Sequence, residues 1–175
     1  MKPVIIGTCP STVCDYELEP CSGRFGKRVA ELSGKFQKAN LEPDIKWFLD
    51  NYIRVNLVPT RPFNIDYARI SACSLKWVLR DSIVMMAGRE VESYFFKNSY
   101  EFFEWIVPVD GYGAWVTIPH PLAGVWWNSS ENSEKARMFF EDIAEKIIKD
   151  NEDDQHVIVD PEPKRMEPWR FTSKQ

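Results

Sequence analysis

Short apolar segments alternate with helical patterns along most of this chain, and this alternation is the strongest constraint on its fold. Four segments have the length and apolar character of buried strands: residues 2–6, 52–57, 82–87 and 114–118. Strands that alternate with helices predict a largely parallel sheet covered on both faces. We therefore expect a three-layer α/β/α sandwich whose mostly parallel central sheet has about four strands.

The segments between these strands carry apolar residues at helical spacing or the usual signals of a helix start. A hairpin with Asp110-Gly111 as its turn is predicted before the strand at 114–118. Residues 128–131, Asn-Ser-Ser-Glu, resemble a capping box that opens an amphipathic helix. Helices are expected over residues 23–34, 43–49, 67–79, 88–95 and 136–147.

A chain of 175 residues is long enough for one domain with a substantial core. We assign residues 1–150 to that domain and residues 151–175 to a polar, proline-containing C-terminal tail. Residues 1–7 break too early for a signal peptide, and no apolar run approaches the roughly 20 residues of a membrane span. The expectation is a cytoplasmic protein with no membrane contact.

The net charge of -4 provides no global positive field that would recruit nucleic acid. Local clusters of basic residues can still contact phosphates. One such cluster consists of Arg24, Lys27, Arg28, Lys35 and Lys38. A solvated helix face is the alternative interpretation of these side chains.

The four cysteines, at positions 9, 14, 21 and 73, do not form a Cys-x-x-Cys pair. This spacing predicts no zinc site and no iron–sulfur cluster. We expect no cofactor. A disulfide is not expected in a reducing compartment. Three cysteines within thirteen residues can still meet in one loop, and that alternative stays open.

Three of the predicted strands end in turns that combine a polar or catalytic residue type with glycine or proline. These turns are Gly7-Thr8-Cys9-Pro10, Asn56-Leu57-Val58-Pro59 and Pro119-His120-Pro121. Open α/β sheets bind ligands at the carboxyl ends of their strands, so the three turns predict a site at that edge. Histidine transfers protons readily near neutral pH, which makes His120 a catalytic candidate. A proline-locked turn whose histidine only bonds nearby backbone is the alternative.

Taken in order, these motifs resemble the uracil-DNA glycosylase superfamily, in a divergent bacterial or phage branch. The resemblance covers roughly residues 3 to 148. It rests on the order and spacing of several short motifs together. These are the Gly7-x-x-Pro10 turn, Ser22-Gly23-Arg24-Phe25-Gly26, the Asn56 strand end, Gly88-Arg89-Glu90-Val91, His120-Pro121-Leu122 and Trp127-Asn128.

The resemblance implies a DNA glycosylase that flips a pyrimidine out of the stack and breaks its N-glycosidic bond. It gives His120 the role of stabilising the departing base, and Asn56 the role of reading the pyrimidine edge. The implied base-binding turn is Gly7, Thr8 and Cys9, and the implied DNA contacts are Arg24, Lys27, Arg28 and Asn128. A simple strand cap is the alternative role of Asn56.

The sequence departs from the family pattern in three places. Thr8 and Cys9 stand where the family usually has a carboxylate or amide that orients water, so Asp15 is the substitute expected from the following loop. Cys21 replaces the ring that stacks on the base, and Tyr16 or Phe25 is expected to take its place. Leu122 replaces the serine of the last turn.

These departures leave two interpretations of the function. The pocket accepts uracil or a larger, modified pyrimidine, in DNA repair or in defence against foreign DNA. Alternatively, the protein kept the fold and lost the chemistry, and is an inactive DNA- or protein-binding module. A small-molecule hydrolase on the same scaffold is a more distant third interpretation.

Overall fold

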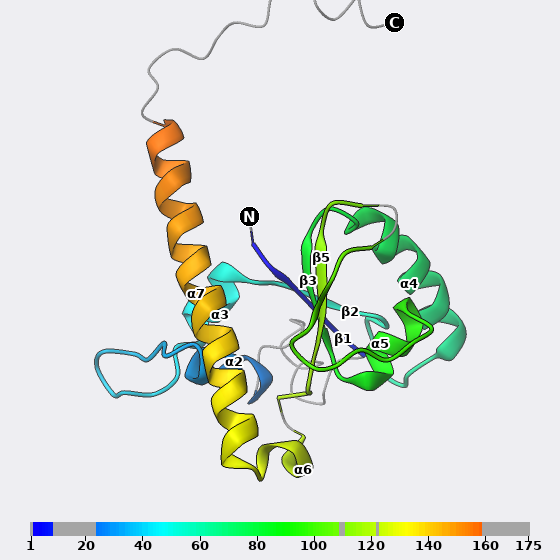
Figure 1. Cartoon of the computed structure of the whole chain (residues 1–175), viewed down its shortest axis with the longest axis horizontal. Helices are drawn as coiled ribbons and strands as arrows, with labels where there is room; N and C mark the ends of the chain where they lie inside the picture. The colour runs from blue at the N-terminus through cyan, green and yellow to red at the C-terminus, as the bar shows by residue number, and fades with distance from the viewer. Residues whose placement is uncertain (1, 9–23, 109–110, 122, 159–175) are drawn as a thin grey trace, which may run out of the picture.

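The computed structural model describes residues 2–8, 24–108, 111–121 and 123–158. At its centre is a five-stranded sheet in the order β2-β1-β3-β5-β4 (Figure 1). Neighbouring strands are parallel from β2 to β5, and the short edge strand β4 runs antiparallel to β5. The strands are β1 (Val4–Gly7), β2 (Ile53–Asn56), β3 (Ile83–Ala87), β4 (Trp105–Ile106) and β5 (Ala114–Ile118).

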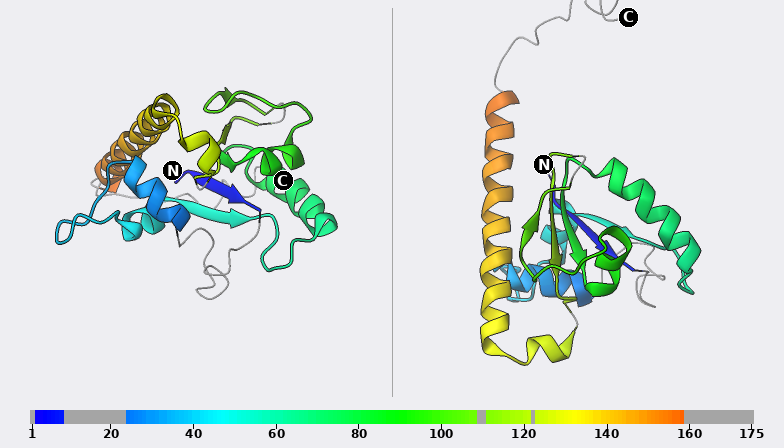
Figure 2. Two further views of the ribbon diagram at one scale, coloured as in Figure 1. Left: turned by 90° about the horizontal axis from the view of Figure 1, so that it is seen from below. Right: turned by 45° about the vertical axis from the view of Figure 1, so that its right-hand side comes forward.

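Helices cover both faces of this sheet (Figure 2). One face packs against α2 (Arg24–Leu32), α3 (Ile45–Asn51) and α7 (Ser130–Ile158), with the short helix α6 (Gly124–Trp127) before α7. The other face packs against α4 (Ile65–Val78) and α5 (Arg89–Phe95). The predicted α/β architecture with a mostly parallel sheet is confirmed.

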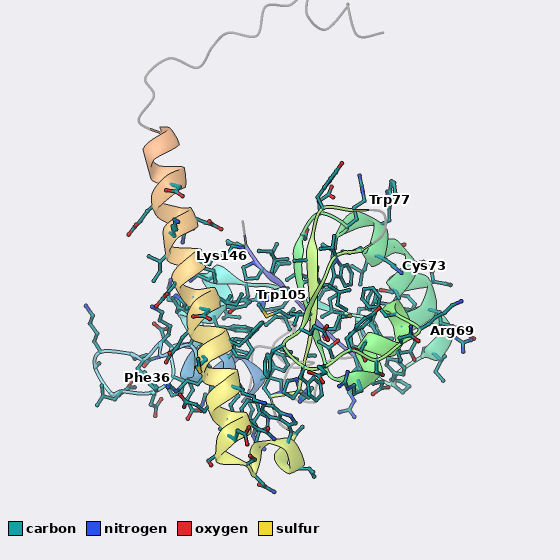
Figure 3. The ribbon with its side chains drawn as sticks, viewed as in Figure 1. Phe36, Arg69, Cys73, Trp77, Trp105 and Lys146 are labelled. Carbon is teal, nitrogen blue, oxygen red and sulfur yellow. The ribbon has the colours of Figure 1, made fainter. Side chains whose placement is uncertain are left out.

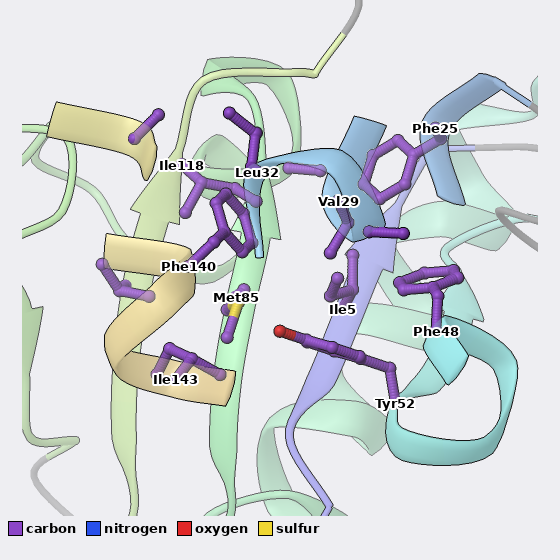
Figure 4. Packing of buried hydrophobic residues seen from close by; sticks show 14 of the residues in the cluster. Ile5, Phe25, Val29, Leu32, Phe48, Tyr52, Met85, Ile118, Phe140 and Ile143 are labelled. Carbon is purple, nitrogen blue, oxygen red and sulfur yellow. The ribbon is translucent and has the colours of Figure 1, made fainter. Parts of the chain in front are cut away.

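The central strand β1 shows why the sequence folds in layers. All four of its residues are buried, as expected for a parallel strand covered on both sides. Ile5 points to the α2, α3 and α7 layer, where it packs with Phe48 and Met85 (Figure 4). Its neighbours Val4 and Ile6 belong to the other layer, because successive side chains of a strand point to opposite faces.

The structure corrects several sequence-based boundaries. The sheet has a fifth strand, β4, which is the first strand of the predicted hairpin and pairs Trp105 with Val116. Residues 124–127, which lie outside the helices expected from sequence, form helix α6. The side-chain cap before α7 is Ser129, whose hydroxyl accepts from the Asn132 N–H at 3.4 Å, so the predicted capping box is displaced by one residue.

The domain boundary at residue 150 stays a prediction, but no helix end coincides with it. Helix α7 continues to Ile158, beyond the sheet that its first half covers (Figure 1). The physical reason is local: between Ser130 and Ile158 the sequence has no proline or glycine to stop a helix, and Pro161 is the first proline after it. Residues 159–175 of the predicted tail lie outside the described residues. No helix in the described part of the chain is long and apolar enough to cross a membrane.

The packing of α7 yields a test of the fold. Phe140 is 1 % exposed and packs in the same cluster as Ile5 and Met85, so Phe140→Ala leaves a cavity there. We expect it to lower the free energy of unfolding by about 3–5 kcal/mol in urea denaturation. Met138→Ala is the matched control, because Met138 is 57 % exposed on the same helix and should change stability by less than about 0.5 kcal/mol. Equal losses in both variants would contradict this packing.

Candidate functional site

The carboxyl ends of the four parallel strands meet along one edge of the sheet, here called the carboxyl rim. It consists of Gly7 and Thr8 after β1, Asn56 at the end of β2, Gly88 after β3, and His120 after β5. The chain leaves β1 for β2 on one side and then crosses to β3 on the other. Such a switch point is where open α/β sheets bind ligands.

The turn that carries His120 is held by three different elements. His120 lies between two buried prolines, and its carbonyl accepts hydrogen bonds from the Ala123 N–H at 2.9 Å and the Trp127 indole N–H at 3.1 Å. The His120 ring packs in an edge-to-face arrangement with the ring of Phe25 from α2, and the ring centroids are 5.4 Å apart. The turn thus fixes the direction of the imidazole before any ligand binds.

The end of β3 lies directly beside this turn. The Gly88 N–H donates to the Ile118 carbonyl at 2.8 Å, and a β-carbon added at Gly88 would stand 3.8 Å from that of His120. Gly88 has a φ of 98°, a left-handed conformation that glycine adopts without strain. The glycine therefore lets the backbone turn into α5 beneath the histidine.

Partial burial lowers the pKa of His120 below its ordinary value of 6.5. The residue is nevertheless exposed to solvent. A neutral imidazole near neutral pH has one N–H donor and one acceptor nitrogen. His120 can therefore donate a hydrogen bond to a developing anion without itself carrying charge.

Asn56 contributes a second polar group to the carboxyl rim. It pairs in register with Gly7, and its amide nitrogen Nδ2 is buried without a hydrogen-bond partner among the described residues. Buried amide donors are nearly always paired in folded proteins, so this nitrogen remains available to a hydrogen-bond acceptor such as water or a ligand. Trp115 also has a buried unpaired nitrogen, but it lies within the core.

The first turn and the turn after β2 run side by side. The Gly7 carbonyl accepts from the Leu57 N–H, and the Thr8 carbonyl accepts from the Val58 N–H, both at 2.9 Å. Thr8 is half-buried. These bonds bring the predicted base-binding residues Gly7 and Thr8 next to Asn56. Cys9, Asp15 and Tyr16 lie outside the described residues, so their roles stay predictions.

Phe25 has a different place from the one that a base-stacking ring needs. It is 7 % exposed, and it packs in the core below the rim while touching His120. So little free surface leaves no open face on which a base can stack. Its contact supports the orientation of His120 instead, and Tyr16 remains the predicted stacking residue.

The predicted DNA-contacting residues fall into two groups. Arg24 and Lys27 are exposed on the first turn of α2. Asn128 is exposed at the C-terminal end of α6, where its N–H donates to the Gly124 carbonyl at 3.1 Å. Arg28 is half-buried; its guanidinium lies 5.5 Å from the centre of the Trp127 ring and 3.8 Å from Glu31. Arg28 thus ties α2 to the helix that holds the His120 turn.

Sequence reasoning missed a buried carboxylate on α5. Glu92 is 2 % exposed and accepts hydrogen bonds from the Thr117 hydroxyl, the Tyr100 N–H and the Arg89 guanidinium. Burial opposes its ionisation, but these hydrogen bonds together lower the pKa of the Glu92 carboxyl. The sequence contained a signal for it, because Thr117 interrupts an otherwise apolar buried strand and Arg89 stands three residues before Glu92.

The Glu92 network has a structural role. Its hydrogen bonds join α5, β5 and the segment after α5, and they leave the carboxylate enclosed away from the rim. Arg89 adds a further contact, with its guanidinium carbon 4.1 Å from the centre of the Phe102 ring. Glu92 therefore does not replace the water-orienting acid that the first turn lacks.

No protein-family model matches the chain, and no curated protein matches it in sequence. Within the described ranges, no group of three or more His, Cys, Asp or Glu side chains is arranged to hold a metal ion. The three cysteines at positions 9, 14 and 21 lie outside those ranges.

Removal of the buried carboxylate should destabilise the protein. Glu92→Ala leaves the Thr117 hydroxyl and the Arg89 charge without their partner, and we expect a loss of about 3 kcal/mol in the free energy of unfolding. The exposed pair of Glu134 with Arg137 is the control, for which Glu134→Ala should cost less than about 1 kcal/mol. Because the pKa of Glu92 is lowered, its contribution should be present above its ordinary value of 4.5 and be lost as the pH falls through the folded-state value. A similar loss in both variants would contradict this role.

The environment of His120 can be tested by an NMR titration of its imidazole. We expect a pKa below 6.5 in the folded protein, and a rise toward 6.5 in Phe25→Ala, which opens one side of the ring to water. A folded-state pKa below the unfolded value means that His120 disfavours folding as the pH falls below 6.5. Phe36→Ala, at an exposed ring in a separate loop, should leave the pKa unchanged. An unshifted His120 pKa in the unsubstituted protein would contradict the described packing.

Proposed function

We propose that this protein is a DNA N-glycosylase that hydrolyses the N-glycosidic bond of a flipped pyrimidine at the carboxyl rim. The observation that carries the proposal is the buried, unpaired amide of Asn56 on the same rim as the neutral, prealigned imidazole of His120. A pyrimidine ring with carbonyl oxygens offers acceptors to both donors.

The distance between the ends of β2 and β5 suits a ligand of the size of a pyrimidine. Strands β2 and β5 are separated by β1 and β3, so their ends lie about 14 Å apart at the usual interstrand distance. We propose that the side chains of Asn56 and His120 contact the ligand from these two strand ends. A flat ring held above Gly7 and Gly88 fills the interval between them, and neither glycine has a side chain to block it.

The chemistry assigned to these groups is a substitution at the sugar carbon. As the C1′–N bond breaks, positive charge develops on the sugar and negative charge on the base. His120 donates a hydrogen bond to the base oxygen and stabilises the anion, while Asn56 holds the opposite edge. Water adds to C1′ and loses a proton, and the products are the free base and an abasic site. Asp15 is the proposed acceptor of that proton.

Contact with DNA is proposed for the exposed basic residues beside the rim. Arg24 and Lys27 stand at the first turn of α2, whose Phe25 touches His120. Asn128 is exposed at the end of α6, whose Trp127 bonds the His120 turn. We propose that these side chains bind phosphates on both sides of a flipped nucleotide.

A second candidate function is an inactive DNA- or protein-binding module on the same fold. The observation that favours it is Thr8 at the end of β1, where a glycosylase of this type is expected to have a carboxylate or amide. Such a module would bind DNA through Arg24 and Lys27 without forming abasic sites.

The test is abasic-site formation on oligonucleotides that contain uracil, 5-hydroxymethylated or glucosylated pyrimidines, deaminated purines, or only unmodified bases. We expect release of one pyrimidine, and a fall in the rate of about 100- to 1,000-fold in His120→Ala and Asn56→Ala, because each loses one donor to the transition state. Lys46→Ala, on the exposed surface of α3, is the control that should retain full activity. Base release that persists in His120→Ala would contradict the assignment.

If no oligonucleotide of the panel releases a base but DNA binding remains, the result would favour the second candidate function. In that case Arg24→Gln and Lys27→Gln should each make the slope of log affinity against log salt shallower by about 0.9 for duplex DNA. Absence of both base release and DNA binding would remove nucleic acid as the partner.

A further inference from the structure

A hollow of about 430 Å³ lies on the other helical face of the molecule, between α4 and the segments that follow α5 and β4. It is here called the α4 groove. Figure 3 shows Cys73 and Trp77 on the outward side of α4, where the groove begins. The residues that line it include Lys76, Trp77, Arg80, Phe96, Tyr100 and Val107.

The walls of the α4 groove are largely aromatic and apolar. Trp77 is 63 % exposed and Val107 is 67 % exposed, so both present apolar surface to solvent. Phe96 is fixed from behind, because its ring meets the edge of the buried Trp115 ring at a centroid distance of 5.9 Å. Tyr100 packs edge-on against Phe96 at the same distance. Flat apolar surfaces that are held rigid in this way suit a planar ligand.

Two cations are held over these aromatic rings. The Lys76 Nζ lies 5.1 Å from the centre of the Phe96 ring and donates to the Phe95 carbonyl at 3.0 Å. The Arg80 guanidinium carbon lies 4.0 Å from the centre of the Trp77 ring, and Arg80 donates to the Trp77 carbonyl at 2.8 Å. Both charges are thus positioned before a ligand arrives.

Among the described residues, Asp81 forms an ion pair with one of these cations and offsets only part of their charge. Asp81 lies 3.9 Å from Arg80 and also accepts the Tyr112 N–H at 2.9 Å. Lys76, Arg80 and Asp81 together carry a formal charge of +1. The other groove residues named above, Trp77, Phe96, Tyr100 and Val107, are uncharged. The groove therefore combines apolar walls with a net positive charge.

We propose that the α4 groove binds a planar aromatic anion, with its rings against Trp77 and Phe96 and its acidic group toward Lys76 and Arg80. The volume lies within the range of about 300–1,000 Å³ that is typical of small-molecule sites. Charge complementarity selects an anion, and the exposed faces of Trp77 and Val107 select flat rings.

This site is independent of the proposed glycosylase site. Arg80 precedes the start of β3, so this part of the groove lies toward the amino ends of the strands, whereas His120 and Asn56 stand at their carboxyl ends. The two sites share no residue. Ligand binding in the groove can therefore be measured without any assumption about DNA.

The test compares two fluorescent probes that have the same rings. 8-Anilinonaphthalene-1-sulfonate carries an acidic group, and N-phenyl-1-naphthylamine lacks it. We expect the sulfonate to bind at least tenfold more tightly, and the double variant K76Q/R80Q to abolish that difference while it leaves the affinity of the neutral probe unchanged. The unchanged neutral probe also reports that the variant is folded. R69Q/K146Q removes the same charge at exposed positions outside the groove and should bind both probes as the unsubstituted protein does.

Cys73 supplies a local readout, because it is exposed and lines the groove. Bound sulfonate should slow the alkylation of Cys73 by iodoacetamide, measured by peptide mapping of the full chain. Equal affinity of the two probes, unchanged sulfonate binding in K76Q/R80Q, or no protection of Cys73 would each overturn the proposal. A dimer in sedimentation that Trp77→Ser converts to monomer would also overturn it, because a second copy would then occupy the groove.

Discussion

The parallel pairing of β1 with β2 and β3 is the interaction on which the rest of this structure depends. Val4, Ile5 and Ile6 are all buried, and they give β1 apolar contacts to the helices on both faces. The same pairing sets Gly7 beside Asn56 and brings the ends of β3 and β5 to the same edge. If β1 shifted by one residue, its side chains would exchange layers and the rim would be lost.

The two ends of the sheet differ in chemistry. At the carboxyl rim, the neutral imidazole of His120 and the unpaired amide nitrogen of Asn56 lie at strand ends that buried prolines and backbone hydrogen bonds hold in place. In the α4 groove, by contrast, cations lie over aromatic rings beside exposed apolar surface. One scaffold thus presents hydrogen-bond donors for a polar ring at one edge and a charged apolar surface on a helical face.

The long apolar strands could be predicted from sequence because burial on both faces requires continuous apolar residues, as in 83–87 and 114–118. The predicted hairpin indicated a strand before β5, but β4 has only two residues and carries no such pattern, so its bounds emerged only from its pairing with β5. Turn signals identified Asn56 and His120 as candidate site residues, but they did not predict which atoms each side chain contacts. Glu92 was missed because its partners Thr117 and Tyr100 are distant in sequence.

The amino-acid sequence by itself determined the alternation of strands and helices, the proline-locked turn of His120 and the glycine at position 88, since periodicity and backbone restriction are local properties. Only the tertiary structure decided that the buried ring of Phe25 packs against His120, that the Trp127 indole N–H donates to the His120 carbonyl, and that Lys76 and Arg80 line one groove. These facts depend on contacts between helices whose relative positions are set by packing on the sheet. The contact of Phe25 with His120 joins residues far apart in the chain, and no local pattern encodes it.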